Sequence, residues 1–134
     1  MGFLEKKPEK VIKDALKVLG KKQLSLIVHG SSFPDLESED TAYGSYNTNG
    51  AKSLIDYIAG TFNSIQLGPN GKLKSCDSSP YTSTIFSGNP LFISLKDLTT
   101  EEWDNILSED TFNNIVNENP NKNVNKTAFS YAYK

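Results

Sequence analysis

Two short apolar runs, each followed by a long polar loop, constrain the fold of this chain most strongly. Residues 24–28 read LSLIV, a combination of apolar and β-branched side chains that predicts a short buried strand. The polar loop 31–49 follows it, and a helix is predicted at 51–59. A second strand is predicted at 64–67, before the polar loop 70–89. This order predicts a βαβ unit with parallel strands.

Both long loops are expected at one edge of the predicted sheet, because the carboxyl ends of parallel strands lie on the same side. Ligands of α/β proteins bind at this edge, and long ordered loops in compact domains are usually functional. His29 directly follows the first strand, which makes it a candidate hydrogen-bond donor to a ligand. A purely structural histidine is the alternative interpretation.

Helices are also predicted on both sides of this unit. Apolar side chains at helical spacing predict an amphipathic helix over 8–19. Thr99 and Glu102 match a capping box, which predicts a short helix from 99 to 107 with Trp103 on its apolar side. A further helix is predicted from 109 to 117, and no element is predicted for the Asn-rich tail that follows.

Composition excludes several classes of function. Lysine and arginine number 14 against 16 aspartates and glutamates, so a net charge of -2 leaves no positive excess for nucleic acid. Cys76 is the only cysteine, so no internal disulfide can form, and with one histidine a zinc site lacks ligands. No apolar run approaches the roughly 20 residues of a membrane span. We therefore expect a cytoplasmic protein without a cofactor, a metal, a nucleic-acid partner or a membrane partner.

Three motifs in the second half of the predicted unit occur in a recognisable order. They are Leu67-Gly68-Pro69 after the second strand, Ser79-Pro80-Tyr81 within the following loop, and Asn89-Pro90 before the apolar run 91–95. In this order they resemble the N-terminal part of the 4-alpha-glucanotransferases, or amylomaltases, of glycoside hydrolase family seventy-seven. The segment 27–34 is similar to the first strand and first loop of that family. The resemblance covers residues 24 to 95, about half of the chain.

The resemblance implies an α/β fold, namely the N-terminal portion of a (β/α)8 TIM barrel with parallel strands, long βα loops and extra helices. A complete barrel needs at least about 200 residues, so the chain is expected to be truncated. Residues 1–22 would form an N-terminal helix and residues 23–98 the first βαβ units of the barrel. Residues 99–134 would form a helical insertion and the Asn-rich tail.

The activity that the resemblance implies is transfer of α-1,4-glucan segments between maltodextrins by a retaining double displacement. This chemistry needs two carboxyl groups about 5 Å apart, one as nucleophile and one as acid and then base. In the family these groups belong to later barrel strands, so no catalytic residue is assigned in this chain. We expect the chain by itself to be an inactive part of the enzyme.

Substrate contacts are the part of the family site that this chain would carry. Tyr81 matches the family tyrosine that lines the donor-sugar site, where a ring can pack on sugar C–H groups and its hydroxyl can bond. Asp77 matches the acidic position before the motif that Ser79 begins. The alternative for Tyr81 is plain packing, and the alternative for Asp77 is a solvated loop residue. Asn89 matches a position whose role is turn geometry, and His29 completes the candidate substrate-binding residues.

Two other interpretations remain open. The chain could be a small, independent α/β module that binds glucan or a protein partner without catalysis. It could also be a protein-interaction domain unrelated to sugars. Cooperative unfolding as a monomer would favour the independent module, whereas a part of a barrel would expose unpaired strand edges and aggregate.

Overall fold

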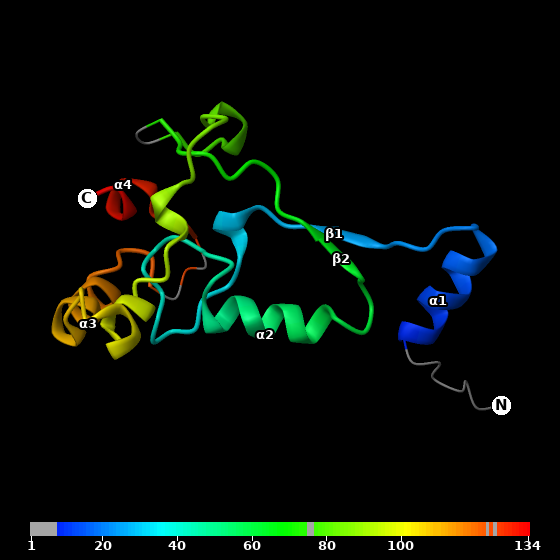
Figure 1. Cartoon of the computed structure of the whole chain (residues 1–134), viewed down its shortest axis with the longest axis horizontal. Coiled ribbons are helices and arrows are strands. Elements are labelled where there is room, and N and C mark those ends of the chain that lie inside the picture. The colour runs from blue at the N-terminus through cyan, green and yellow to red at the C-terminus, as the bar shows by residue number, and fades with distance from the viewer. Residues whose placement is uncertain (1–7, 75–76, 123, 125) are drawn as a thin grey trace.

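The computed structural model describes residues 8–74, 77–122, 124 and 126–134. Cys76, on which the disulfide and zinc arguments rest, lies outside these ranges, as do the first seven residues of the expected N-terminal helical region. The regular elements are shown in Figure 1. They are α1 (Pro8–Val18), β1 (Ser25–Ile27), α2 (Asn49–Ile58), β2 (Ser64–Gln66), α3 (Glu109–Asn117) and α4 (Phe129–Ala132), joined by single turns of 3-10 helix.

Strands β1 and β2 pair in parallel, as the order of the sequence pattern predicts. Leu26 lies opposite Ile65 in the register, and the backbone of Val28 continues the ladder by donating to Gln66 at 3.0 Å. The side chain of Asn63 closes the other end of the pair, where its oxygen accepts a hydrogen bond from the Leu24 backbone at 2.9 Å. Helix α2 connects the strands, so the described residues contain the predicted βαβ order.

The burial predicted for the first strand is wrong. Ile27 is 65% exposed and Leu26 is only half-buried. Within the described ranges the sheet has two strands, and no third strand flanks them. A parallel strand is buried only when helices cover both faces of its sheet and other strands flank it. The apolar character of 24–28 therefore exceeds what this pair can bury.

Loop 31–49 is anchored to the N-terminus of α2. The side chain of Thr48 accepts a hydrogen bond from the Ala51 backbone at 3.2 Å, which caps the helix. The buried carboxylate of Glu39 accepts a second one from the Gly50 backbone at 2.7 Å. A side chain at position 50 would lie 2.4 Å from the carbonyl oxygen of Pro34, so only glycine allows the loop to approach this closely. A negative charge at this end is also favoured by the helix dipole.

The helix predicted from 99 to 107 is wrong. Two turns of 3-10 helix, Asp97–Thr99 and Glu101–Trp103, occupy its start, and Asp104 and Asn105 then adopt left-handed backbone angles, with φ of 54° and 49°. A right-handed helix cannot continue through such residues. Trp103 is 50% exposed and does not belong to the core.

The capping box proposed for that helix is also wrong. The Thr99 hydroxyl lies within hydrogen-bond distance of two acceptors, the carbonyl of Lys96 at 2.8 Å and the carboxylate of Glu109 at 3.0 Å. It does not cap a helix that includes Glu102. Glu109 also forms an ion pair with Lys96 at 2.9 Å. These contacts attach the irregular segment to the first turn of α3. Tertiary contacts have replaced the local capping that the spacing of the two residues favours.

The predicted helix from 109 to 117 is confirmed as α3, with Ser108 as its N-cap. Helix α4 lies in the tail, where no element was predicted. Buried apolar side chains belong to the loops, α2 and α3 and not to the sheet. Among the described residues they are Phe33, Ala42, Tyr43, Ala51, Ile58, Leu73, Phe92, Phe112 and Val116. No helix in the described part of the chain has the length and apolar character to span a membrane.

Phe112 offers a direct test of this core, because it is only 1% exposed. We expect Phe112→Ala to lower the free energy of unfolding by about 3 to 5 kcal/mol, since the cavity adds to the lost transfer energy. Phe86, which is 99% exposed, provides the matched control: Phe86→Ala should change stability by less than about 0.5 kcal/mol. Urea denaturation followed by circular dichroism measures both, and equal losses would contradict the core described above.

Candidate functional site

The loops that follow β1 and β2 meet on the same side of the sheet (Figure 1). His29 follows β1, and Tyr81 belongs to the 3-10 turn Pro80–Thr82 in the loop after β2. Their rings lie 5.8 Å apart between centroids, at an interplanar angle of 86°. Residues that are 52 positions apart in the chain thus form one surface. This contact places the predicted residues His29 and Tyr81 together at the carboxyl edge of the strands.

The orientation of Tyr81 depends on Asp77. One oxygen of this carboxylate accepts a hydrogen bond from the Ser79 backbone at 2.9 Å, and the other accepts one from the Thr82 hydroxyl at 2.8 Å. These two bonds, the Ser79 one foremost, hold the pKa of Asp77 below its usual range. Both oxygens are therefore engaged within the turn. Through these bonds Asp77 and the Ser79 backbone stabilise the turn that carries the exposed ring of Tyr81.

Asn89 lies beneath the surface and joins the two loops. It is 6% exposed, and its side-chain nitrogen donates to the hydroxyl of Tyr43 at 3.1 Å. Its side-chain oxygen accepts a hydrogen bond from the Leu91 backbone at 3.1 Å, which caps the turn Pro90–Phe92. Since both of its polar groups have protein partners, Asn89 supports the site and is not directed at a ligand.

Tyr43 is a site residue that the sequence arguments missed. Its ring packs at 5.6 Å from both Phe92 and Phe129, so loop 31–49, the segment after loop 70–89, and the tail meet around it. Burial raises the pKa of Tyr43, so its hydroxyl stays protonated near neutral pH and can serve both as donor and as acceptor. The sequence contains a Tyr43-Gly44 pair in the first long loop, but nothing in the sequence shows that Tyr43 bonds to Asn89.

An open hollow of about 410 Å³ lies next to His29. One wall comes from the two loops and the other from the tail, and the lining residues are His29, Ser31, Ser32, Ser78, Pro80, Lys126, Thr127 and Phe129. The backbone N–H of Ala128 donates a hydrogen bond to the carbonyl of Ala42 at 2.9 Å, which holds the tail there. No sequence pattern predicts this docking, since Ala128 and Ala42 are distant in the chain.

Gly68 allows the imidazole of His29 to lie against the turn after β2. The backbone of Gly68 has φ of +74°, and a side chain there would come within 2.8 Å of the His29 Nδ1 atom. This Nδ1 is buried and has no hydrogen-bond partner among the described residues. Glycine is thus required twice at this position, by its backbone conformation and by the close approach of the ring.

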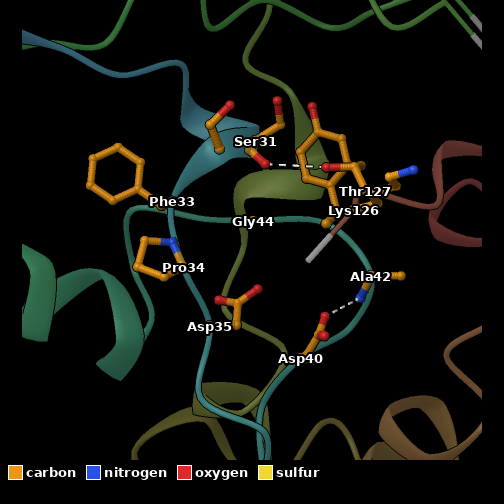
Figure 2. Close-up of a pocket in the computed structure, with 11 residues that line it drawn as sticks. Ser31, Phe33, Pro34, Asp35, Asp40, Ala42, Gly44, Lys126 and Thr127 are labelled. Atoms are coloured by element: carbon orange, nitrogen blue, oxygen red, sulfur yellow. Dashed lines mark hydrogen bonds between the residues drawn. The ribbon is translucent and has the colours of Figure 1, made fainter. Parts of the chain in front are cut away.

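A second hollow, of about 470 Å³, lies between loop 31–49 and the tail (Figure 2). Asp35 forms part of its lining, and one of its oxygens, Oδ1, is buried without a hydrogen-bond partner in the described ranges. Burial, with smaller contributions from the nearby Asp40 and Glu39, raises the pKa of Asp35 to about 7, against an opposing hydrogen bond from Thr48. The sequence arguments did not predict this group.

The described side chains at this edge can contact a polar ligand. The exposed ring of Tyr81 and the imidazole of His29 can contact a polar ligand, while the Asp77 carboxylate is occupied within its own turn. Within the described ranges no three His, Cys, Asp or Glu side chains gather as a set that could hold a metal ion. The site therefore offers aromatic and hydrogen-bonding contacts.

No protein-family model, curated protein or solved structure matches this chain. Its function is therefore inferred from its residues and from their geometry. The two loops that meet at the His29–Tyr81 contact are the same segments that carry the motifs of the sequence resemblance.

The raised pKa of Asp35 leads to a test by pH. The folded protein keeps the proton up to about pH 7, whereas the unfolded chain releases it near the ordinary value of 3.8. Stability is therefore lost as the pH rises through this interval. Asparagine cannot ionise, so we expect the melting temperature of Asp35→Asn, relative to the unmodified protein, to increase between about pH 5 and pH 8.

Differential scanning calorimetry at both pH values measures this difference. Asp56→Asn, which changes an exposed carboxylate on α2, serves as the control and should show no such trend. A constant difference between Asp35→Asn and the unmodified protein across the pH range would contradict the burial of this carboxyl group.

Proposed function

We propose that this chain is the N-terminal part of a 4-alpha-glucanotransferase barrel and forms one wall of its donor-sugar site. The observation that supports this most strongly is the contact of His29 with Tyr81 at the carboxyl edge of the parallel strands. Substrates of α/β barrels bind at this edge. The motif residues that resemble those of the family are thus gathered where a barrel enzyme holds its ligand.

Tyr81 has the chemistry that a glucan contact needs. Its side chain is 75% exposed, so both the ring and the hydroxyl are accessible. An aromatic face packs on the C–H groups of a pyranose, and the phenolic hydroxyl bonds to a sugar oxygen. The perpendicular packing with His29 and the Asp77 hydrogen bonds restrict the turn, which lowers the entropy lost on binding.

The exposed sheet also supports a place within a larger barrel. Ile27 is 65% exposed on a strand whose sequence is apolar. In a closed barrel each parallel strand has a neighbour on both sides and a helix layer outside it. We propose that further strands of the same barrel cover this surface in the complete enzyme.

Catalysis would depend on carboxylates outside these 134 residues. A retaining mechanism requires a nucleophile and an acid/base group about 5 Å apart. Asp77 would be a poor general acid, because hydrogen bonds from Ser79 and Thr82 hold its pKa below the usual range. In this proposal the chain binds and orients the glucan, and the later strands supply the reacting groups.

The first test of the proposal is an activity assay. Incubated with maltotriose, the purified 134-residue protein should release no glucose and form no longer maltodextrins, because it lacks the catalytic pair. Chromatography with pulsed amperometric detection measures both products. Formation of glucose together with longer chains would show that the acid/base and nucleophile lie within this chain, contrary to the proposal.

The second test measures glucan binding. We expect Tyr81→Ala to weaken binding of maltoheptaose about tenfold, the equivalent of 1.4 kcal/mol, because the sugar loses its packing surface and a hydrogen bond. Tyr81→Phe should keep the part of the maltoheptaose affinity that comes from packing on the ring. Tyr57→Ala is the matched control, since Tyr57 lies on α2 and is 86% exposed.

NMR chemical-shift titration suits the weak affinities expected for a partial site. The proposal predicts shifts at His29 and around the Pro80–Thr82 turn in the unmodified protein. Equal weakening by Tyr81→Ala and Tyr57→Ala, or an absence of any response to maltoheptaose, would count against a sugar site at this edge.

A further inference from the structure

The sequence contains two Asn-Gly pairs, Asn49-Gly50 and Asn70-Gly71. In such a pair the backbone nitrogen of the glycine can attack the side-chain amide of the asparagine, and the missing Cβ of glycine leaves the approach unhindered. Attack within one chain is fast when the two groups lie close together and can align. The reactivity of each pair therefore depends on what holds its carboxamide and its glycine N–H.

At Asn49-Gly50 both groups are occupied. The N–H of Gly50 donates to one oxygen of the buried Glu39 carboxylate at 2.7 Å, and the Asn49 carboxamide donates to the other oxygen at 3.1 Å. The pair also begins helix α2, so its backbone is held in the helical conformation. Hydrogen bonds to a charged group are among the stronger ones in proteins. This pair can therefore react only after a local opening of the fold.

At Asn70-Gly71 neither group is occupied by a described residue. The pair lies in the loop after β2, and both residues are partly exposed. An isolated bridge pairs Gly71 with Gly88. Its hydrogen bonds are donated by the backbones of Lys72 and Asn89, at 3.1 and 3.0 Å, so the N–H of Gly71 stays outside them. No described residue accepts a hydrogen bond from that N–H or bonds to the carboxamide of Asn70.

The fold itself requires glycine after Asn70. A Cβ at position 71 would lie 1.8 Å from the carbonyl oxygen of Thr84, so only glycine lets the loop close. The Oδ1 atom of Asn70 is buried without a donor in the described ranges, so the folded chain does not stabilise the intact amide by a hydrogen bond to this atom. The closure of the loop thus depends on the glycine that makes Asn70 reactive.

We propose that Asn70-Gly71 is a site of spontaneous deamidation in the folded protein. The Gly71 nitrogen forms a bond to Cγ of Asn70, and the bond from Cγ to Nδ2 breaks. The departing nitrogen takes the proton of the Gly71 N–H and leaves as ammonia. Water then opens the resulting succinimide at either carbonyl, which yields aspartate or isoaspartate at position 70. Water is the one co-reactant, and the reaction does not depend on the proposed glucan site.

Isoaspartate at position 70 would disturb the closure of the loop that carries Tyr81. Its main chain runs through the former side-chain carbonyl, which adds one carbon to the backbone. The carbonyl of Asn70, which accepts a hydrogen bond from the Asn89 backbone at 3.0 Å, becomes part of a free carboxylate. The bridge between Gly71 and Gly88 would lose its register. We therefore expect this modification to loosen the loop at its base.

Peptide mapping by mass spectrometry tests the proposal on the full chain. Trypsin cleaves after lysine, so Asn49 is recovered in peptide 23–52 and Asn70 in peptide 53–72. During incubation at about pH 8, where the attacking nitrogen loses its proton more easily, Asn70 should deamidate at least about tenfold faster than Asn49. In urea the two rates should agree within about twofold, because both residues precede glycine and the tertiary contacts are lost.

Two controls make the assignment specific. Asn63 lies in the same peptide as Asn70 but is held by hydrogen bonds with Leu24 and Lys22, and fragment ions distinguish the two asparagines. Asn70→Gln should remove the mass change from peptide 53–72 and leave peptide 23–52 unaffected, because the longer side chain forms its ring far more slowly.

The effect on the loop is measured by hydrogen exchange. In the isoaspartate fraction the Asn89 amide should exchange about tenfold faster than in the intact protein, because its acceptor is lost. Equal rates at Asn49 and Asn70 in the folded protein, a mass change that persists in Asn70→Gln, or no reaction at Asn70 while it reacts in urea would each overturn the proposed site. Unchanged exchange at Asn89 would overturn the loosening of the loop.

Discussion

The hydrogen bond between Asn89 and Tyr43 is the contact on which the candidate site depends most. Both side chains are buried, and their bond joins segments 46 positions apart in the chain. Asn89 also caps the turn that leads away from the second loop, while the Tyr43 ring holds Phe92 and Phe129. A buried bond of this kind is costly to break, because a buried polar group that loses a partner has no water to replace it.

Around this junction, order in the loops comes from aromatic packing and side-chain hydrogen bonds and not from the sheet. Because β1 and β2 are parallel, both loops leave the sheet at the same edge. The pair itself buries little apolar surface. The loops in turn are held by Glu39 and Thr48 at α2 and by Asp77 in its turn. Binding residues can therefore be well placed even though they belong to loops.

Loop 31–49 takes part in two surfaces of different chemistry. Through the adjoining His29 and the Tyr43 junction it supports the aromatic surface of Tyr81, which suits an uncharged ligand with many hydroxyls. Through Asp35 it lines a hollow beside a partly buried carboxyl group whose pKa is raised. The docked tail borders both hollows, so the position of Thr127 and its neighbours affects each of them.

The elements whose signals are local could be predicted from the amino-acid sequence. Helical spacing predicted α1, α2 and α3 within a few residues, and the order of the apolar runs predicted the parallel pair. The motif Ser79-Pro80-Tyr81 indicated Tyr81 as a candidate site residue, and the end of the first strand indicated His29. Caps and periodicity act over one or two turns, so they can be recognised without knowledge of the rest of the chain.

Where these local signals fail, and which distant groups meet, depends on long-range contacts in the folded chain. Thr99 does not take its expected capping role, and its hydroxyl instead lies near the carbonyl of Lys96 and the carboxylate of Glu109. The tail docks on the first loop through Thr127 and Ser31, which are 96 positions apart, and Asp35 is partly buried beside Asp40 and Glu39. Burial and long-range hydrogen bonds depend on the path of the whole chain, which is why neighbouring residues alone do not reveal them.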